Sequence, residues 1–230
     1  MHEIPGLHPE VVDFARKVVM AGFRVVMPSM FGKPGKKPGP LYMANSIARA
    51  CVSREFTVLA TRKNSEITDW LRDLAREEHE RSGHNVGAIG MCLTGGFALA
   101  MMVDDHMMAP VLSQPSLPFA ILPHQCRDLG VDDETLAKVK KRCVEDGVCL
   151  MGLRFSMDRM VPSSRFRRLE TELGDNFIAV EINSALGNGH RIKPWAHSVL
   201  AIDYVDQPGH PTHDAMLQVI DFFREKLADR

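Results

Sequence analysis

Apolar residues recur along this chain in two patterns, a helical spacing and short continuous runs. The helical spacing predicts amphipathic helices, and the continuous runs predict strands that are buried on both faces. The continuous runs lie at Phe23–Met27, Asn85–Met91, Ala109–Ser113, Val148–Leu153 and Phe177–Ile182. The helical patterns lie at His8–Ala21, Leu93–Val103, Asp133–Glu145, Pro162–Leu173 and from near Thr212 onward, together with a polar helix that Asn64 or Ser65 caps and that ends near Arg81.

The alternation of these elements predicts an α/β fold, with a mostly parallel sheet and helices on both of its faces. Three stretches interrupt the alternation. Ser29–Pro40 is rich in glycine, proline and lysine and indicates a surface loop, residues 41–62 are helical or irregular, and Asn183–Ala196 is a long polar loop. Long loops without structure usually carry function or are disordered. We expect a single domain over residues 1–230.

The composition is that of an ordinary globular chain of 230 residues, with 45% hydrophobic and 25% charged residues. The formal net charge of -1 predicts neither a nucleic-acid partner nor an anionic membrane partner. The five cysteines form no CxxC pair and the ten histidines show no metal-ligand spacing, so we expect no metal, no cofactor and a reducing, cytoplasmic setting. The chain lacks both a signal peptide and an apolar run of about 18 residues.

The most informative stretch is Gly87-Ala-Ile-Gly-Met-Cys92-Leu-Thr-Gly-Gly96. An apolar strand runs into a cysteine that has glycine two residues before it, and small residues and an apolar helix follow. This layout is typical of a nucleophile elbow, a tight strand-to-helix turn that projects one side chain above the end of the sheet. A helix N-terminus favours negative charge, so a cysteine there can act as a thiolate. The backbone N–H of Leu93 would form half of an oxyanion hole.

Two other interpretations of the same stretch remain open. Cys92 can be a small buried residue before a glycine-rich helix. The glycine pair also suggests a phosphate-binding turn, but neither GxGxxG nor GxxxxGK[ST] is present.

With IGMCLTGG as its elbow, the chain resembles the dienelactone hydrolase family of α/β-hydrolases. The resemblance extends over nearly the whole chain, through HEIPGLHPEVVDFARKVVMAGFRVVMPSMFG, SMDRMVP and AHSVLAIDY. It implies an α/β-hydrolase fold and hydrolysis of a small ester or lactone, as in a carboxymethylenebutenolidase. The family has glycine two residues after the nucleophile, where this chain has Thr94.

α/β-Hydrolases supply their triad in the order nucleophile, acid, histidine. Asp158 follows an apolar strand and precedes Pro162, and His197 follows the long polar loop, so both satisfy this order. The resemblance implies the same two roles. His190 and His210 compete with His197, but they lie in GNGHRIKP and between glycine and proline, which indicate solvated turns.

The resemblance also assigns roles to the first residues of the chain. It implies that Glu3 lies near the nucleophile and modulates its ionisation, and that the N–H of Ile4 completes the oxyanion hole. In the family this turn follows a central strand, so this chain lacks the family's first N-terminal strands. Two explanations stay open: the chain is a truncated version of a longer protein, or Phe23–Met27 pairs directly with the elbow strand.

The residue in the position of one family arginine bears on the substrate that we expect. The family's anionic lactones are held by arginines, one of them four residues after the catalytic histidine, and Ala201 stands there. We therefore expect a more neutral small ester or lactone, no macromolecular partner, and a monomer or homodimer. Two rival classes remain. One is a cysteine amidotransferase or peptidase, whose histidine is commonly followed two residues later by glutamate, where this chain has Val199. The other is a catalytically weak or inactive protein of the same fold that binds a ligand or senses redox state.

Overall fold

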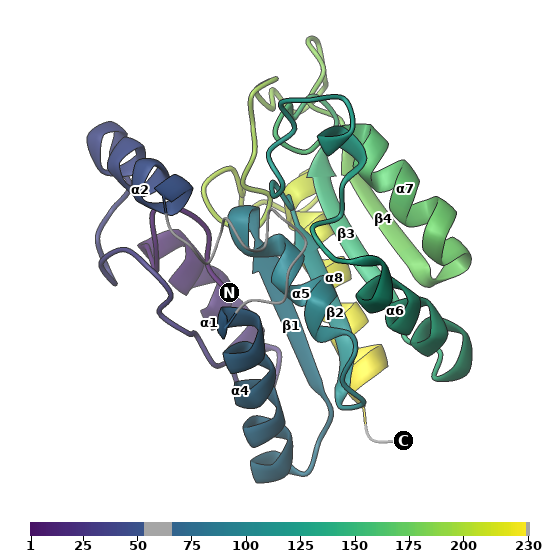
Figure 1. The fold of residues 1–230 in the computed structure, drawn as a ribbon. Coiled ribbons are helices and arrows are strands. Elements are labelled where there is room, and N and C mark those ends of the chain that lie inside the picture. The colour runs from purple at the N-terminus through teal and green to yellow at the C-terminus, as the bar shows by residue number, and fades with distance from the viewer. Residues whose placement is uncertain (53–65, 229–230) are drawn as a thin grey trace.

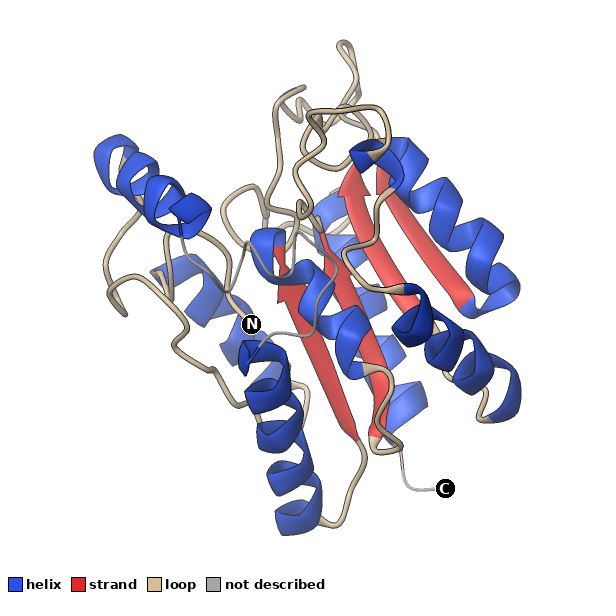
Figure 2. Cartoon of the chain, viewed as in Figure 1, coloured by secondary structure: helices blue, strands red, loops and turns tan. Residues whose placement is uncertain are grey.

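A four-stranded parallel sheet forms the centre of the computed structural model, which describes residues 1–52 and 66–228 (Figures 1 and 2). The strand order is β1-β2-β3-β4, so each new strand is added on the same side. The strands are β1 (Val86–Met91), β2 (Met107–Ser113), β3 (Leu150–Phe155) and β4 (Phe177–Ile182). Because all four are parallel, their carboxyl ends meet at one edge, where open α/β sheets bind ligands.

Helices cover both faces of this sheet, which confirms the predicted α/β fold (Figure 1). Helix α8 and helix α1 share one apolar core with the sheet, and α5, α6 and α7 share another on the opposite face. The helices are α1 (Pro9–Met20), α2 (Pro40–Val52), α4 (Glu66–Ser82), α5 (Gly95–Met101), α6 (Asp133–Glu145), α7 (Ser163–Leu173) and α8 (Pro211–Leu227), with 3-10 turns η1 (Cys92–Thr94), η2 (Gln125–Arg127) and η3 (Gly174–Asn176).

The predicted elements occur with shifted boundaries. The helix expected at Leu93–Val103 is divided into η1 and α5 because the elbow tightens its first turn, and β3 begins two residues later than expected. Residues 40–52 are helical, and the rest of the expectation for residues 41–62, like the caps at Asn64 and Ser65, lies outside the described residues.

The prediction of a strand at Phe23–Met27 is wrong. The segment has no regular secondary structure and pairs with no strand, and β1 is the edge of the sheet in the described chain. A cavity of about 490 Å³, lined by Phe23, Val25 and Met27 on one side and by Gly87 and Ile89 on the other, lies between them. The expectation that this segment pairs directly with the elbow strand is therefore also wrong, because backbone groups across such a cavity are too far apart to bond.

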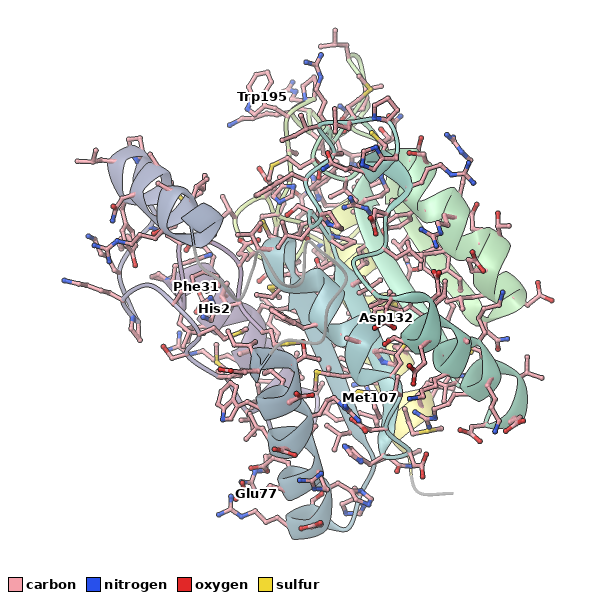
Figure 3. The ribbon with its side chains drawn as sticks, viewed as in Figure 1. His2, Phe31, Glu77, Met107, Asp132 and Trp195 are labelled. Carbon is pink, nitrogen blue, oxygen red and sulfur yellow. The ribbon has the colours of Figure 1, made fainter. Side chains whose placement is uncertain are left out.

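The N-terminal turn packs beside the elbow strand instead. The Met1 amino group donates a hydrogen bond to the carbonyl oxygen of Ile89 at 2.6 Å. The His2 ring is buried against Phe31, with ring centroids 4.4 Å apart, and its Nε2 accepts a bond from the Met30 amide (Figure 3). These contacts bring residues 1–6 next to the carboxyl end of β1.

Candidate active site

Cys92 lies at the tip of a sharp bend between β1 and α5. Its φ of 54° is left-handed, a conformation that an L-residue holds only where its surroundings enforce it. A Cβ atom at Gly90 would clash with the carbonyl oxygen of Thr94, and one at Gly95 would lie 2.6 Å from the Cα of Pro115. Both positions therefore require glycine, and the bend has the geometry of a nucleophile elbow.

Thr94, at the position where the resembled family has glycine, supports this bend. Its Oγ1 accepts a hydrogen bond from the Met91 amide at 2.9 Å. The same oxygen lies 3.2 Å from the carbonyl oxygen of Met1 and 3.3 Å from that of His2. The threonine hydroxyl thus connects the elbow to the N-terminal turn, a role that glycine could not fill.

His197 and Asp158 are in direct contact. Asp158 lies in the loop after β3 and is buried, and its Oδ2 is 2.7 Å from Nδ1 of His197, which lies in the loop after β4. The other carboxylate oxygen accepts a bond from the Met160 amide. Asp203 accepts bonds from the amides of His197 and Ser198, so the loop that carries the histidine is fixed as well. Asp158 therefore orients the imidazole ring, and Asp203 fixes the backbone that carries it.

The second ring nitrogen of His197, Nε2, is the one that Asp158 does not bind. Nε2 is buried and makes no hydrogen bond of regular geometry within the described chain. Burial on its own would lower the pKa of His197, but the nearby Cys92 sulfur and the hydrogen bond with Asp158 raise it. The pKa of His197 therefore lies well above its usual value. A ring placed between a sulfur and a carboxylate favours its protonated form.

Ser116 is a polar neighbour of the sulfur that the sequence reading missed. Its Oγ lies 3.2 Å from Sγ of Cys92, and its amide donates to the Cys92 carbonyl at 3.0 Å. The residue is fully buried, and it follows β2 by way of Gln114, whose φ is 37°. Its place in the sequence could have indicated this role, because residues just after a buried parallel strand lie at the same edge of the sheet as the elbow.

The two residues expected to form the oxyanion hole lie beside Cys92. Ile4, Leu93 and Cys92 belong to one apolar cluster, and all three are buried. Leu93 is in the 3-10 turn that begins at Cys92, so its amide is at the start of the helical segment. The structure therefore brings both expected residues together with the cysteine.

Glu3 is buried in a polar network that links the loop after β2 to the loop that carries His197. Its Oε2 accepts a bond from Nε2 of Gln114 at 2.8 Å, and its Oε1 accepts one from Oγ of Ser198 at 2.6 Å. Nε2 of His8 lies 3.3 Å from the same Oε1. Ser198 follows His197 and Gln114 is two residues before Ser116, so the carboxylate connects both loops. The sequence reading named Glu3 but not these three partners.

His8 supplies the counter-charge for this buried carboxylate. Burial would lower the pKa of His8, but Glu3 and Glu10, both in contact with the ring, raise it above its usual value. The side chain is fully buried. A protonated His8 balances the charge of Glu3, which would otherwise be costly to bury.

We expect replacement of His8 by glutamine to lower the free energy of unfolding by about 2 kcal/mol at pH 6, the scale of a charged hydrogen bond. Because the folded pKa of His8 is raised above its usual value, its contribution is full below about pH 6.5 and is lost as the pH rises through the folded pKa. The destabilisation should therefore shrink between pH 6 and pH 9 in denaturant unfolding. His124→Gln, at an exposed position, is the control, and a pH-independent loss at position 8 would contradict a charged His8.

The competing histidines lie elsewhere. The rings of His190 and His210 contact each other edge to face, with centroids 5.5 Å apart. Nδ1 of His210 bonds with Thr212 at the start of α8. Within the described residues, His197 is the one of the three candidate histidines that bonds to Asp158 and interacts electrostatically with Cys92.

The described residues contain no group of three or more histidine, cysteine or acidic side chains placed to hold a metal ion. Among them, no helix combines the length and apolarity needed to cross a bilayer.

Comparison with known proteins identifies the class of this protein. The profile of the dienelactone hydrolase family matches residues 1–227, and the chain belongs to this family. No curated protein sequence matches it. Among solved structures, it is similar to a monoacylglycerol lipase from Paleococcus ferrophilus, with 14% identity, a TM-score of 0.47, and coverage of 91% of this chain and 88% of that one. Family membership supports a hydrolase.

Proposed function

We propose that the protein hydrolyses small carboxylic esters or lactones through a Cys92–His197–Asp158 triad, as an enzyme of carboxymethylenebutenolidase type. The observation that carries the proposal is that, at the edge where the strands end, the His197 ring bonds to the buried Asp158 carboxylate and is close enough to the Cys92 sulfur for the two groups to interact electrostatically. Membership of the dienelactone hydrolase family supports it independently.

In the proposed resting state the proton lies on His197 and Cys92 is a thiolate. The raised pKa of His197 supports this ion pair. The Ser116 hydroxyl would donate its hydrogen to the sulfur, which satisfies a buried anion that has little contact with solvent. Asp158 stabilises the imidazolium and fixes which nitrogen faces the sulfur.

The reaction then proceeds in two halves. The thiolate attacks the substrate carbonyl, and the amides of Leu93 and Ile4 would hold the resulting oxyanion. As the carbon–oxygen ester bond breaks, the leaving alkoxide takes the proton from Nε2 of His197, and a thioester remains on Cys92. Neutral His197 then removes a proton from water, the hydroxide attacks the thioester, and the carboxylic acid leaves as the thiolate–imidazolium pair is restored.

Glu3 would act in this scheme as a positioning residue. Its carboxylate holds Ser198, which is adjacent to the catalytic histidine, and Gln114, which leads to Ser116. His8, whose pKa is raised, places a positive charge beside that carboxylate. Its proposed effect on the nucleophile is therefore transmitted through the two loops.

The proposed substrate is uncharged near its carbonyl group. Ala201, the residue in the place of the family arginine, is buried, as are its neighbours Val199 and Leu200. An anionic lactone would find no guanidinium there to form the paired hydrogen bonds that a carboxylate accepts from arginine.

We expect kcat/KM for neutral p-nitrophenyl esters and neutral lactones to exceed that for anionic dienelactones by at least about tenfold, the scale of one lost charged hydrogen bond. A substrate panel at fixed pH and ionic strength measures this ratio. Ala201→Arg is the matched variant, and its activity should shift toward the anionic lactone. A clear preference of the parent protein for the anionic lactone would refute the neutral-substrate proposal but not the triad.

A further inference from the structure

The loops that follow β2, β3 and β4 form one continuous surface around the candidate site. Since the strands are parallel, residues 119–127, 156–160 and 183–197 all emerge from the same edge of the sheet (Figures 1 and 2). We refer to these three segments together as the loop rim. Asp158 and His197 lie within it, so whatever contacts the rim also faces the candidate site.

Hydrogen bonds hold the rim segments against one another. The amide of Met157 donates to Oγ of Ser184, and the amide of Ser184 donates to Oγ of Ser156, which joins the loops after β3 and β4. The Ser164 hydroxyl, at the start of α7, donates to the carbonyl of Cys126 and anchors the loop after β2 beside them. These hydrogen bonds hold the loops after β3 and β4 together and tie the loop after β2 to the start of α7.

Large apolar side chains project from every segment of this rim into solvent. Leu186 is 87% exposed, Ile121 80% and Trp195 76%. Leu122, Met157 and Met160 are also exposed. Figure 3 shows Trp195 pointing outward at this edge, away from the body of the sheet. Exposed apolar groups gathered on one face mark a surface that meets an apolar partner.

Within the three rim segments, the exposed charged side chains have a single sign. Arg127, Arg159, Arg191 and Lys193 are exposed, and no carboxylate of the described chain lies within ion-pair distance of any of them. The acidic residue of these segments is Asp158, which is buried against His197. The rim therefore combines apolar side chains with cations and presents no exposed carboxylate.

We propose that the loop rim docks on an anionic lipid surface, with Trp195 and its apolar neighbours entering the boundary between headgroups and acyl chains. Cations beside apolar and aromatic side chains are the combination that binds such interfaces, because the cations meet lipid phosphates while the apolar groups leave water. A fluid lipid layer also accommodates side chains from three separate loops without a matching rigid surface. Docking would bring lipophilic esters from the layer directly to the candidate site.

The chain contains two tryptophans, Trp70 on α4 and Trp195 in the rim, so fluorescence can report on the rim alone. In Trp70→Phe, emission comes only from Trp195, and adding phosphatidylglycerol vesicles should shift it to shorter wavelength by about 10 nm or more as the indole leaves water. Trp195→Phe, in which Trp70 is the remaining reporter, is the control and should show no shift. An unchanged Trp195 spectrum at saturating phosphatidylglycerol would overturn the proposal.

Charge is tested separately with the double variant Arg191→Glu/Lys193→Glu in the Trp70→Phe background. Each cation near an anionic surface contributes enough that vesicle affinity should fall at least about tenfold. Equal binding of the parent to phosphatidylcholine and phosphatidylglycerol vesicles would overturn the anionic assignment. The measurement reports binding and needs no turnover, so its outcome is independent of the proposed hydrolysis. Hydrolysis of a water-soluble ester by the double variant should match the parent.

Discussion

Replacement of Cys92 by alanine is expected to abolish ester hydrolysis, with kcat/KM lowered by more than about 10³-fold. Loss of a nucleophile removes the covalent intermediate entirely, and what remains reflects binding and oxyanion stabilisation alone. The variant should still fold, because replacing the buried thiol by a methyl group removes a single heavy atom and leaves only a small void beside Ser116. Initial rates with a neutral p-nitrophenyl ester, together with thermal unfolding of both proteins, measure the two effects.

Cys126→Ala is the matched control, since Cys126 is half-buried and its thiol lies against the backbone carbonyl of Ala120, not against Cys92, Asp158 or His197. It should retain parental activity. Alkylation by iodoacetamide at neutral pH should label Cys92 in the parent and inactivate it in proportion. If Cys92→Ala kept more than a few per cent of the parental rate, Cys92 would not be the nucleophile and the non-catalytic interpretation of the fold would gain support.

Replacement of Asp158 by asparagine is expected to lower kcat by about 10²- to 10⁴-fold with little change in fold. The carboxylate accepts the hydrogen of Nδ1 of His197 at 2.7 Å, which directs Nε2 toward the sulfur and stabilises the charged ring. An amide can offer its N–H group there instead, and this favours the wrong tautomer; a loss of about 10⁴-fold accompanies this exchange in the serine protease triad.

The same variant should alter the pH profile in a defined direction. Asp158 is one of the groups that raise the pKa of His197, so its neutralisation lowers that pKa. The alkaline limb of kcat, which reports loss of the acidic form of His197, should therefore move to lower pH. Asp221→Asn, on the exposed face of α8, is the control for loss of a carboxylate. An unchanged profile in Asp158→Asn would mean that Asp158 does not act on the histidine.

The elbow could be predicted because its constraints are local. A strand, a glycine, a cysteine and small residues occur within one short run, and the backbone bend that they specify does not depend on distant parts of the chain. The α/β fold was predictable for the same reason, as each buried strand and each amphipathic helix carries its own periodicity. Asp158 and His197 could be named as candidates because chain order restricts the choice.

The segment Phe23–Met27 shows where local pattern fails. Its apolar residues are suited to a strand, but a strand exists only if another strand bonds to it, and across the cavity beside β1 none does. The polar network around Glu3 has the same origin. Gln114, Ser198 and His8 are far apart in the chain, and no local feature indicates that they converge on one carboxylate.

The amino-acid sequence by itself determined the class of fold, the position of the bend that presents Cys92 and the order of the candidate triad, since each follows from neighbouring residues or from chain order. Only the tertiary structure decided that Ser116 touches the sulfur and that Glu3 joins the loop after β2 to the loop that carries His197. It also decided that the cations of the three rim segments gather at one edge of a chain whose net charge is -1. These features depend on which strand ends meet at one edge of the sheet, and that arrangement is set by long-range packing.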